Sequence, residues 1–246
     1  ILLFLGSIAQ APNDYVIMTE ILAGNVCQVL KKTKETGKAI SWDIATQIML
    51  DVSEAMDFLH SRDPPIIHRD LKSENVLLTP DWRAKVADLG LSREIVSHKA
   101  GHYTVCGTPC WVAPEIFRGE SYGWQVDVYS FAIVVWEILA GIKPFRGISL
   151  LDLPDLVARR CQRPEIPGKT PRDLKLLMAA MWADNPMSRP DFCRIQIALH
   201  RIRNEIPDLE KAMVLKSSPK KSNNHRIRGN NNDGQMNSNQ CGSGSL

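Results

Sequence analysis

The stretch that decides the fold of this chain reads His68-Arg69-Asp70-Leu71-Lys72-Ser73-Glu74-Asn75. Taken alone, its aspartate would cap a turn about as often as it would take part in chemistry. Two further motifs follow in order: Asp88-Leu89-Gly90 comes after two short apolar runs, and Ala113-Pro114-Glu115 closes a long polar loop. The ordered set, rather than any single motif, indicates both the fold and the chemistry.

On the N-terminal side, the pattern indicates two strands and a turn. The opening run Ile1 to Leu5 is typical of the middle of a strand, and Tyr15 to Met18 is a second short apolar run. Gly24 and Asn25 indicate a turn, after which we expect a polar loop from Lys31 to Lys38. This apolar run starts at the first residue, with no segment that leads into the strand. We therefore expect that the sequence begins inside a domain.

A long amphipathic helix directly precedes the polar stretch. Ser41 is a suitable N-cap, and Asp43 stands in the first turn. Apolar residues then recur at helical spacing up to His60, namely Ile44, Ile48, Val52, Ala55 and Leu59. The pattern predicts one helix that packs by a single face.

On the C-terminal side, we expect a hairpin formed by Val76 to Thr79 and Ala84 to Ala87. A long loop from Leu91 to Pro109 follows, and a loop of this length inside a compact domain usually has a function. Asp127 to Ala140 is apolar around nearly its whole circumference, which predicts a helix buried in the middle of a domain and ended by Gly141.

Two more helices and a tail complete the chain. Thr170, Pro171 and Asp173 indicate a helix start, with Leu174, Leu177, Met178 and Met181 as its buried stripe. The last helix would bury Phe192, Ile195, Leu199 and Ile202. After about Lys216 almost no apolar residue remains, so we expect a disordered tail.

Composition excludes several classes of protein. The net charge of +3 is too small to indicate a nucleic-acid partner. The six cysteines form no C-x-x-C pair, so we expect neither a zinc site nor disulfides, but reduced thiols in the cytoplasm. The longest apolar run, Phe131 to Trp136, is far too short to cross a membrane. We interpret His60 and His200 as surface or loop residues.

The three motifs resemble those of the eukaryotic protein kinases, because residues 68–75 match H-R-D-L-x-x-x-N at every defined position. The resemblance covers residues 1–203 and implies an α+β fold, mostly the helical C-terminal lobe with the last strands of the small lobe. Residues 204–246 would be a C-terminal extension. Lys72-Ser73 and the run Gly107 to Glu115 look most like the tyrosine-kinase-like serine/threonine group, which includes the Raf and mixed-lineage kinases.

The resemblance implies a transfer of phosphate from ATP to a protein Ser or Thr. Asp70 would accept the proton of the substrate hydroxyl, and Lys72 would reach the γ-phosphate. Asp88 and Asn75 would hold Mg²⁺, which prefers hard oxygen ligands. Thr108 would support Asp70 and Lys72 and form the floor under the acceptor.

The same resemblance places the adenine ring of ATP near the start of the chain. Thr19 would be the gatekeeper, and Glu20, Ile21 and Leu22 would be the hinge that meets adenine with backbone groups. Leu77 would be the apolar floor under the ring.

Further roles follow from the resemblance alone. Arg69 implies a positive pocket for a phosphate on the activation loop, added by an upstream kinase, with Ser97, Tyr103 and Thr104 as candidate acceptors. Glu115 with Arg189 would form a buried ion pair. Asp127 would lie beneath the polar stretch.

The departures from the family pattern leave an alternative open. No Gly-rich phosphate loop, strand lysine or helix glutamate precedes Tyr15, so we expect this stretch by itself to be inactive. Leu89 stands where Phe is commonest and should serve the same packing role. The alternative to an enzyme is a pseudokinase or a docking module that binds other kinases or substrates.

Overall fold

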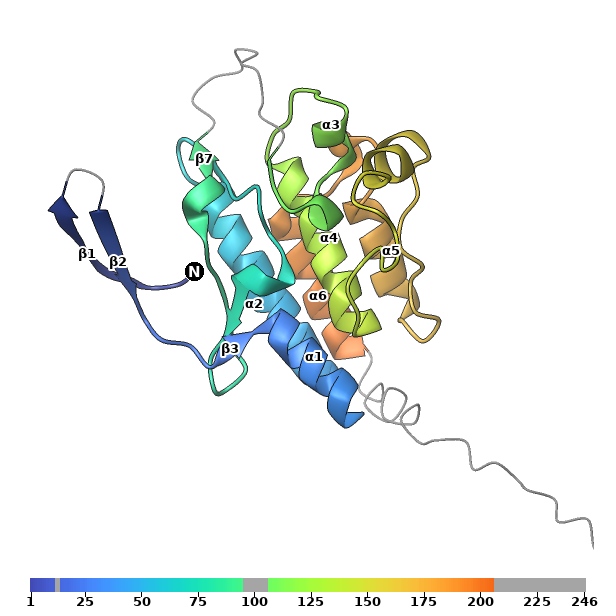
Figure 1. Cartoon of the computed structure of the whole chain (residues 1–246). Helices are drawn as coiled ribbons and strands as arrows, with labels where there is room; N and C mark the ends of the chain where they lie inside the picture. The colour runs from blue at the N-terminus through green and yellow to red at the C-terminus, as the bar shows by residue number, and fades with distance from the viewer. Residues whose placement is uncertain (12–13, 95–105, 206–246) are drawn as a thin grey trace, which may run out of the picture.

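The computed structural model describes residues 1–11, 14–94 and 106–205. Within these residues, a body of helices carries small antiparallel sheets along one side (Figure 1). The described strands are β1 (Phe4–Ala11), β2 (Asp14–Thr19), β3 (Gly24–Asn25), β4 (Ile66–Ile67), β5 (Val76–Leu78), β6 (Ala84–Val86) and β7 (Arg93–Glu94).

The described helices are α1 (Val26–Thr36), α2 (Trp42–His60), α3 (Pro114–Phe117), α4 (Gln125–Ala140), α5 (Arg172–Met181) and α6 (Phe192–Glu205). Short 3-10 helices are η1 (Ser73–Asn75), η2 (Leu89–Leu91), η3 (Pro109–Trp111) and η5 (Pro186–Ser188), and η4 (Asp155–Arg159) is π-helical. The combination of helices and small sheets confirms the expected α+β class.

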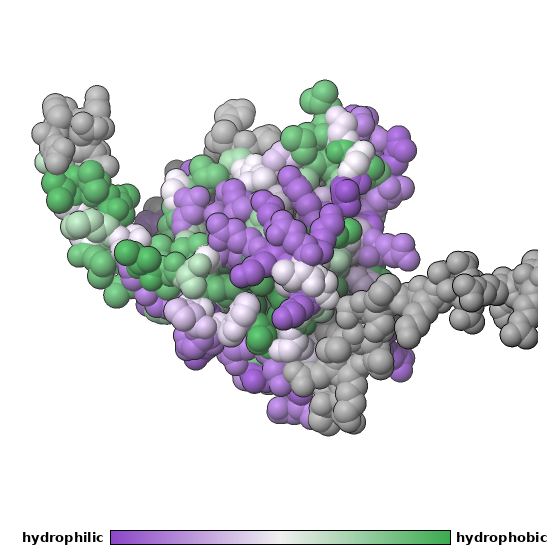
Figure 2. All heavy atoms as spheres, turned by 60° about the horizontal axis from the view of Figure 1, so that its bottom comes forward, coloured by the Kyte–Doolittle hydropathy of each residue, from purple (hydrophilic) through white to green (hydrophobic). Residues whose placement is uncertain are grey.

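The hairpin of β1 and β2 stands away from the helical body (Figure 1). Both strands carry exposed apolar side chains, including Leu5 at 61% and Ile17 at 68% exposure. Figure 2 shows hydrophobic residues gathered along this arm. A backbone hydrogen bond of 2.9 Å from Leu2 N to Val86 O joins the start of the arm to β6.

The polar loop expected from Lys31 to Lys38 was wrong, because α1 continues to Thr36. The helix starts with a reciprocal capping box: the Asn25 side chain accepts from Gln28 N at 2.9 Å, and Gln28 Oε1 accepts from Asn25 N at 3.0 Å. Gly37 ends the helix in the left-handed conformation, with φ of 69°.

α1 was not predicted from the sequence because little of the helix is buried. Only Val26 and Leu30 are fully buried along it, and the rest of its surface is mainly lysine, threonine and glutamate. A polar helix of this kind is stabilised by its caps and by its one buried face. Its sequence shows no regular apolar period from which it could be predicted.

The amphipathic helix and the hairpin were predicted correctly. α2 starts after Ser41, whose Oγ accepts from Ile44 N at 3.3 Å, and ends at His60. β5 and β6 pair antiparallel, and β3 joins them along the other side of β5. β5 directly follows the stretch from 68 to 75 in the chain.

The centre of the body is α4, as predicted. Every residue from Val126 to Ile138 is buried, and Gly141 ends the helix with φ of 67°. The helix contacts α2 and α5, and its Phe131 ring lies 5.5 Å from the ring of Phe192 on α6. Because α4 is buried along nearly its whole length, the residues at its two ends are held in fixed positions.

The two C-terminal helices also follow the prediction. α5 buries Leu174, Met178 and Met181, with Leu177 half-buried, and α6 buries Phe192, Ile195, Leu199 and Ile202. α6 packs on α2 and ends at Glu205. The tail expected after Lys216 lies outside the described residues.

The predicted ion pair between Glu115 and Arg189 is confirmed. Arg189 NH1 lies 2.6 Å from Glu115 Oε1 and NH2 lies 2.8 Å from Oε2, with both side chains almost completely buried. The pair fastens the start of α3 to the segment before α6. Among the described residues, no helix is long and apolar enough to cross a membrane.

Candidate active site

The stretch from 68 to 75, hereafter the catalytic loop, is held from below by Asp127 at the start of α4. Asp127 Oδ2 accepts from His68 N at 2.8 Å, and Oδ1 accepts from Arg69 N at 2.9 Å. These bonds confirm the predicted place of Asp127. His60 Nε2 lies 2.9 Å from Asp127 Oδ2, so the interpretation of His60 as a surface residue was wrong.

The side chains of Asp70, Lys72 and Thr108 contact one another. Asp70 Oδ1 accepts from Thr108 N at 2.9 Å and from Thr108 Oγ1 at 2.7 Å. Lys72 Nζ lies 2.6 Å from Asp70 Oδ2 and 2.8 Å from Thr108 Oγ1. Because each member touches the other two, the carboxylate of Asp70 is fixed in direction and paired with a positive charge.

Gly107 makes the approach of Thr108 possible. Its φ is 102°, and a Cβ at this position would lie 2.8 Å from the carbonyl oxygen of Arg69. A side chain is therefore excluded by the backbone of the catalytic loop as well as by the backbone angle. The glycine allows the two segments to lie close enough for Thr108 N to reach Asp70.

Asn75 and Asp88 lie next to this group. Asn75 Nδ2 donates to Asp70 O at 2.9 Å, which leaves the side-chain oxygen of Asn75 as a ligand. Ala87 N donates to Asn75 O at 2.9 Å, so the residue before Asp88 is fastened to the loop. Asp88 is exposed, in the left-handed conformation with φ of 63°.

The oxygens of Asn75 and Asp88 suit Mg²⁺, although they cannot enclose the ion. In the described part of the chain, no three His, Cys, Asp or Glu side chains are grouped as a metal site. Magnesium is commonly held by one or two carboxylates together with water and substrate phosphates. The donor set therefore fits an ion that arrives with a phosphate ligand.

The predicted hinge follows β2 and lies beside the β3–β5 pair. Ala23 N donates to Leu78 O at 2.9 Å, which brings the end of the hinge next to the half-buried Leu77. The backbone groups of Ile21 and Leu22 have no hydrogen-bond partner among the described residues. They are available to a flat ligand with polar edges.

In contrast to these backbone groups, the side chains of Glu20 and Thr19 form hydrogen bonds within the chain. The carboxylate of Glu20 accepts from Lys85 Nζ at 2.7 and 2.8 Å and from Leu3 N at 2.7 Å, contacts that hold its pKa below the ordinary value. Thr19 Oγ1 donates to Glu20 O at 3.2 Å. The carboxylate of Glu20 is thus engaged within the chain, so a ligand at this place would meet the hinge through backbone atoms.

The long loop expected from Leu91 to Pro109 is described only at its two ends. Arg69 donates from Nε to the carbonyl oxygen of Leu91, close to where β7 pairs with β4. Ser97, Tyr103 and Thr104 lie outside the described residues. The predicted phosphate pocket at Arg69 therefore stays a prediction.

Sequence reasoning missed one buried acid near the loop. Glu137, on α4, is 3% exposed, accepts from Trp111 Nε1 at 2.8 Å and lies 3.1 Å from Ser73 Oγ. Burial raises the pKa of its carboxyl to about 8, although both neighbouring donors lower it. A lone glutamate within an otherwise apolar helix was the signal that could have found it.

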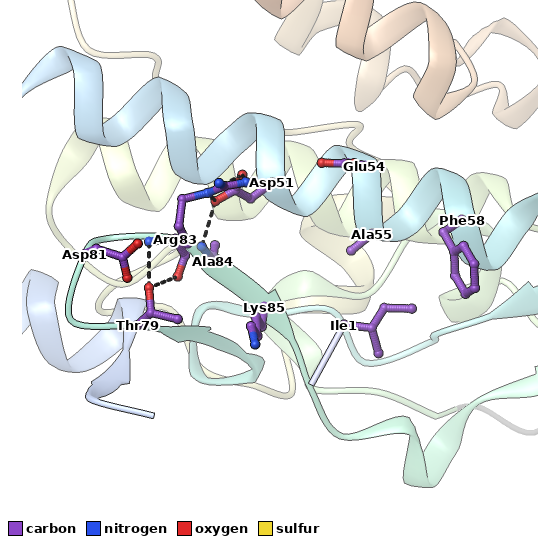
Figure 3. A pocket seen from close by; sticks show the side chains of 10 residues that line it. All are labelled: Ile1, Asp51, Glu54, Ala55, Phe58, Thr79, Asp81, Arg83, Ala84 and Lys85. Carbon is purple, nitrogen blue, oxygen red and sulfur yellow. Dashed lines mark hydrogen bonds and ion pairs between the residues drawn. The ribbon is translucent and has the colours of Figure 1, made fainter. Parts of the chain in front are cut away.

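A separate cavity of about 570 Å³ lies between α2 and the β5–β6 hairpin, and Figure 3 shows its lining. Asp51 and Arg83 join across its wall at 2.8 and 2.9 Å, and Asp51 also accepts from Ala84 N at 2.8 Å. None of the predicted site residues lines this cavity. Its polar groups brace α2 against β6.

Comparisons with known proteins agree on one family. A model described as protein tyrosine and serine/threonine kinase matches residues 1–199. Probable serine/threonine-protein kinase drkC of Dictyostelium discoideum is 34% identical over 194 residues, 78% of this chain and 26% of that protein. Probable serine/threonine-protein kinase drkB of the same organism is 37% identical over 188 residues, 76% of this chain and 26% of that protein.

A plant relative is similar to the same extent. Serine/threonine-protein kinase CTR1 of Arabidopsis thaliana is 33% identical over 210 residues, 84% of this chain and 25% of that protein. The chain thus spans about a quarter of the length of these three relatives.

Proposed function

The chain belongs to the protein tyrosine and serine/threonine kinase family, and on this premise we propose that the protein transfers the γ-phosphate of ATP to Ser or Thr of protein substrates. The observation that carries the proposal is the contact of Asp70, Lys72 and Thr108 within 2.9 Å of one another. Phosphoryl transfer needs reactants held in position and charge neutralised, and little covalent help.

Each member of the group has one task. Asp70 receives the hydrogen of the substrate hydroxyl and orients the oxygen for attack. Lys72 balances negative charge at the transferred group, and its ammonium serves as a point charge. Thr108 holds Asp70 through its N–H and hydroxyl, and it forms the surface under the acceptor.

ATP and Mg²⁺ are the cofactors of this proposal. Asn75 and Asp88 would hold the metal through side-chain oxygens, and the bound metal would supply neutralisation of phosphate charge. The backbone of Glu20, Ile21 and Leu22 would bind adenine, with Thr19 as gatekeeper and Leu77 under the ring.

The acceptor class rests on Lys72 and on the names of the relatives. All three relatives described above are named serine/threonine-protein kinases. We place the chain in the tyrosine-kinase-like group because of Lys72-Ser73 and the run from Gly107 to Glu115. A pseudokinase or docking module is not favoured by these names.

The remaining parts of the proposal concern the surroundings of the site. The kinase domain would cover residues 1–203, with 204–246 as its extension. An upstream kinase would phosphorylate the activation loop, which lies between Leu91 and Pro109, near Arg69. The free thiols of the described cysteines support a cytoplasmic location.

The test is a phosphorylation assay with labelled ATP and Mg²⁺ on the full-length protein. Asp70→Asn should lower transfer to Ser and Thr by about 10²-fold or more, the range of a lost general base. Asp81→Asn, in an exposed turn, is the matched control and should retain activity. Equal transfer by the Asp70→Asn variant, or transfer to Tyr alone, would contradict the proposal.

A further inference from the structure

A pocket of about 410 Å³ lies directly beside the catalytic loop, and the proposed reaction does not use it. Its walls come from α1, from Glu74 of the loop, from Glu137 of α4, and from the segment that follows α4, which includes Ile142. Lys72, which lies 2.6 Å from Asp70, is two residues from Glu74. The pocket therefore borders the loop that carries Asp70.

Four exposed cations line the pocket, namely Lys31, Lys34, Lys143 and Arg146. Lys31 and Lys34 are three residues apart on α1 and so lie on one face of the helix. In the part of the chain that the structure describes, none of the four forms an ion pair with a carboxylate. Their positive charge is available to a ligand.

The two acids of the pocket do not cancel these charges. Glu137 is buried against Trp111 and Ser73, and burial raises its pKa to about 8, so its carboxyl is mostly uncharged at neutral pH. Glu74 is half-buried, with Ser73 Oγ 3.3 Å from its Oε2. Four exposed cations therefore share the pocket with two acids, of which Glu137 is mostly uncharged.

The pocket also has an apolar side, made by Leu30 and Ile142. Its volume is at the lower end of the range of ligand sites, which suits one or two side chains of a peptide. Cations at a rim add little affinity each, but they select partners of opposite charge and speed their approach. Arg146 adds a planar donor fork that matches carboxylate and phosphate.

We propose that this pocket binds an anionic side chain of the protein substrate, a carboxylate or a phosphate, close to the Ser or Thr that is phosphorylated. The inference rests on the proposed kinase function and names a property of its substrates. The pocket would thereby select substrates with acidic or already phosphorylated flanks.

The first test compares four Ser peptides that differ only in the residues flanking the acceptor: Asp, phosphoserine, Asn or Lys. With the full-length protein at low salt, kcat/KM for the Asp or phosphoserine peptide should exceed that for the Asn peptide about ten-fold. The Lys peptide should be the poorest. The ratio of the two anionic peptides identifies the source of the charge, and equal rates for all four would overturn the proposal.

The second test changes the pocket. Lys31→Glu with Lys34→Glu should remove most of the preference for anionic peptides, so that the ratio of kcat/KM for the Asp peptide to that for the Asn peptide falls close to one. Lys32→Glu, on the same helix but outside the lining, is the matched control and should keep the preference. An unchanged preference in the double variant would place the recognition elsewhere.

Binding without catalysis separates this inference from the proposed function. If no peptide is phosphorylated, the kinase proposal fails, and fluorescence anisotropy of the same labelled peptides on the full-length protein decides the second question. Tighter binding of the anionic peptides that is lost in the double variant supports the pocket. Equal affinity for the Asp and Asn peptides overturns it.

Discussion

Replacing Glu115 by Gln tests how strongly the buried ion pair supports the fold. Arg189 and Glu115 are 0% and 1% exposed, and two bonds of 2.6 and 2.8 Å join them. Glutamine has the same shape without the charge, and its NH₂ group would face a guanidinium N–H. Arg189 would keep its bonds to the carbonyl groups of Ala183 and Gln125, but its charge would remain buried without a counter-charge.

The expected loss follows from that geometry. Breaking a buried pair by removing one partner typically costs about 3–5 kcal/mol. Since a domain of ordinary stability has about 5–15 kcal/mol in total, the variant should unfold at far lower denaturant concentration. Both bonds of this pair are short and both side chains are inaccessible, so we expect a value inside this range.

Urea unfolding followed by tryptophan fluorescence measures the difference. Glu120→Gln is the matched control, because Glu120 pairs with Arg118 at 2.8 Å but is 51% exposed, and it should cost less than about 1 kcal/mol. A Glu115→Leu, Arg189→Met double variant should recover much of the loss, since no charge stays buried. A loss for Glu115→Gln no larger than that of the control would refute the reasoning.

Other predictions concern single contacts. Glu137→Gln removes a carboxyl whose native pKa of about 8 lies above its ordinary value; the native protein binds this proton more tightly, so its stability falls as pH rises from about 4.5 to 8. Chemical denaturation at several pH values measures this effect. As the pH rises over this range, the free energy of unfolding of the Gln variant should increase relative to that of the wild type, by on the order of 1.4 kcal/mol per unit of pKa shift. Asn25→Ala removes the cap of α1 and should lower the free energy of unfolding by about 1 kcal/mol; no change in urea midpoint would contradict the capping box. Thr108→Val removes the hydroxyl between Lys72 and Asp70 and should lower kcat in the phosphorylation assay by about ten-fold or more while the melting temperature stays near that of the wild type; unchanged kcat would argue against the positioning role.

Sequence alone predicted the helices that bury either one face or their whole circumference. α2 has a cap at Ser41 and a regular apolar period, and α4 is apolar around its circumference, so both left an unambiguous pattern. Within the site, the motifs placed Asp70, Asn75 and Asp88 in order along the chain. The contact between Asn75 and Asp70 comes from the fold.

What escaped prediction depends on contacts between distant segments. α1 is held by a reciprocal cap at Asn25 and two buried residues, which leave almost no period in the sequence. His60 looked like a surface residue because nothing near it in the chain reveals Asp127, which is 67 residues away. The altered pKa of Glu137 arises from burial, which a sequence does not display.

The attachment of the catalytic loop to Asp127 also sets how rarely that loop opens. The amide groups of His68 and Arg69 both donate to a carboxylate that is 0% exposed, at the start of a helix buried along most of its length. Breaking these two bonds requires α4 and the loop to separate, a motion close in cost to global unfolding. The hydrogens of these two amides should therefore exchange with solvent as slowly as those in the middle of α4, although they lie outside any long helix or strand.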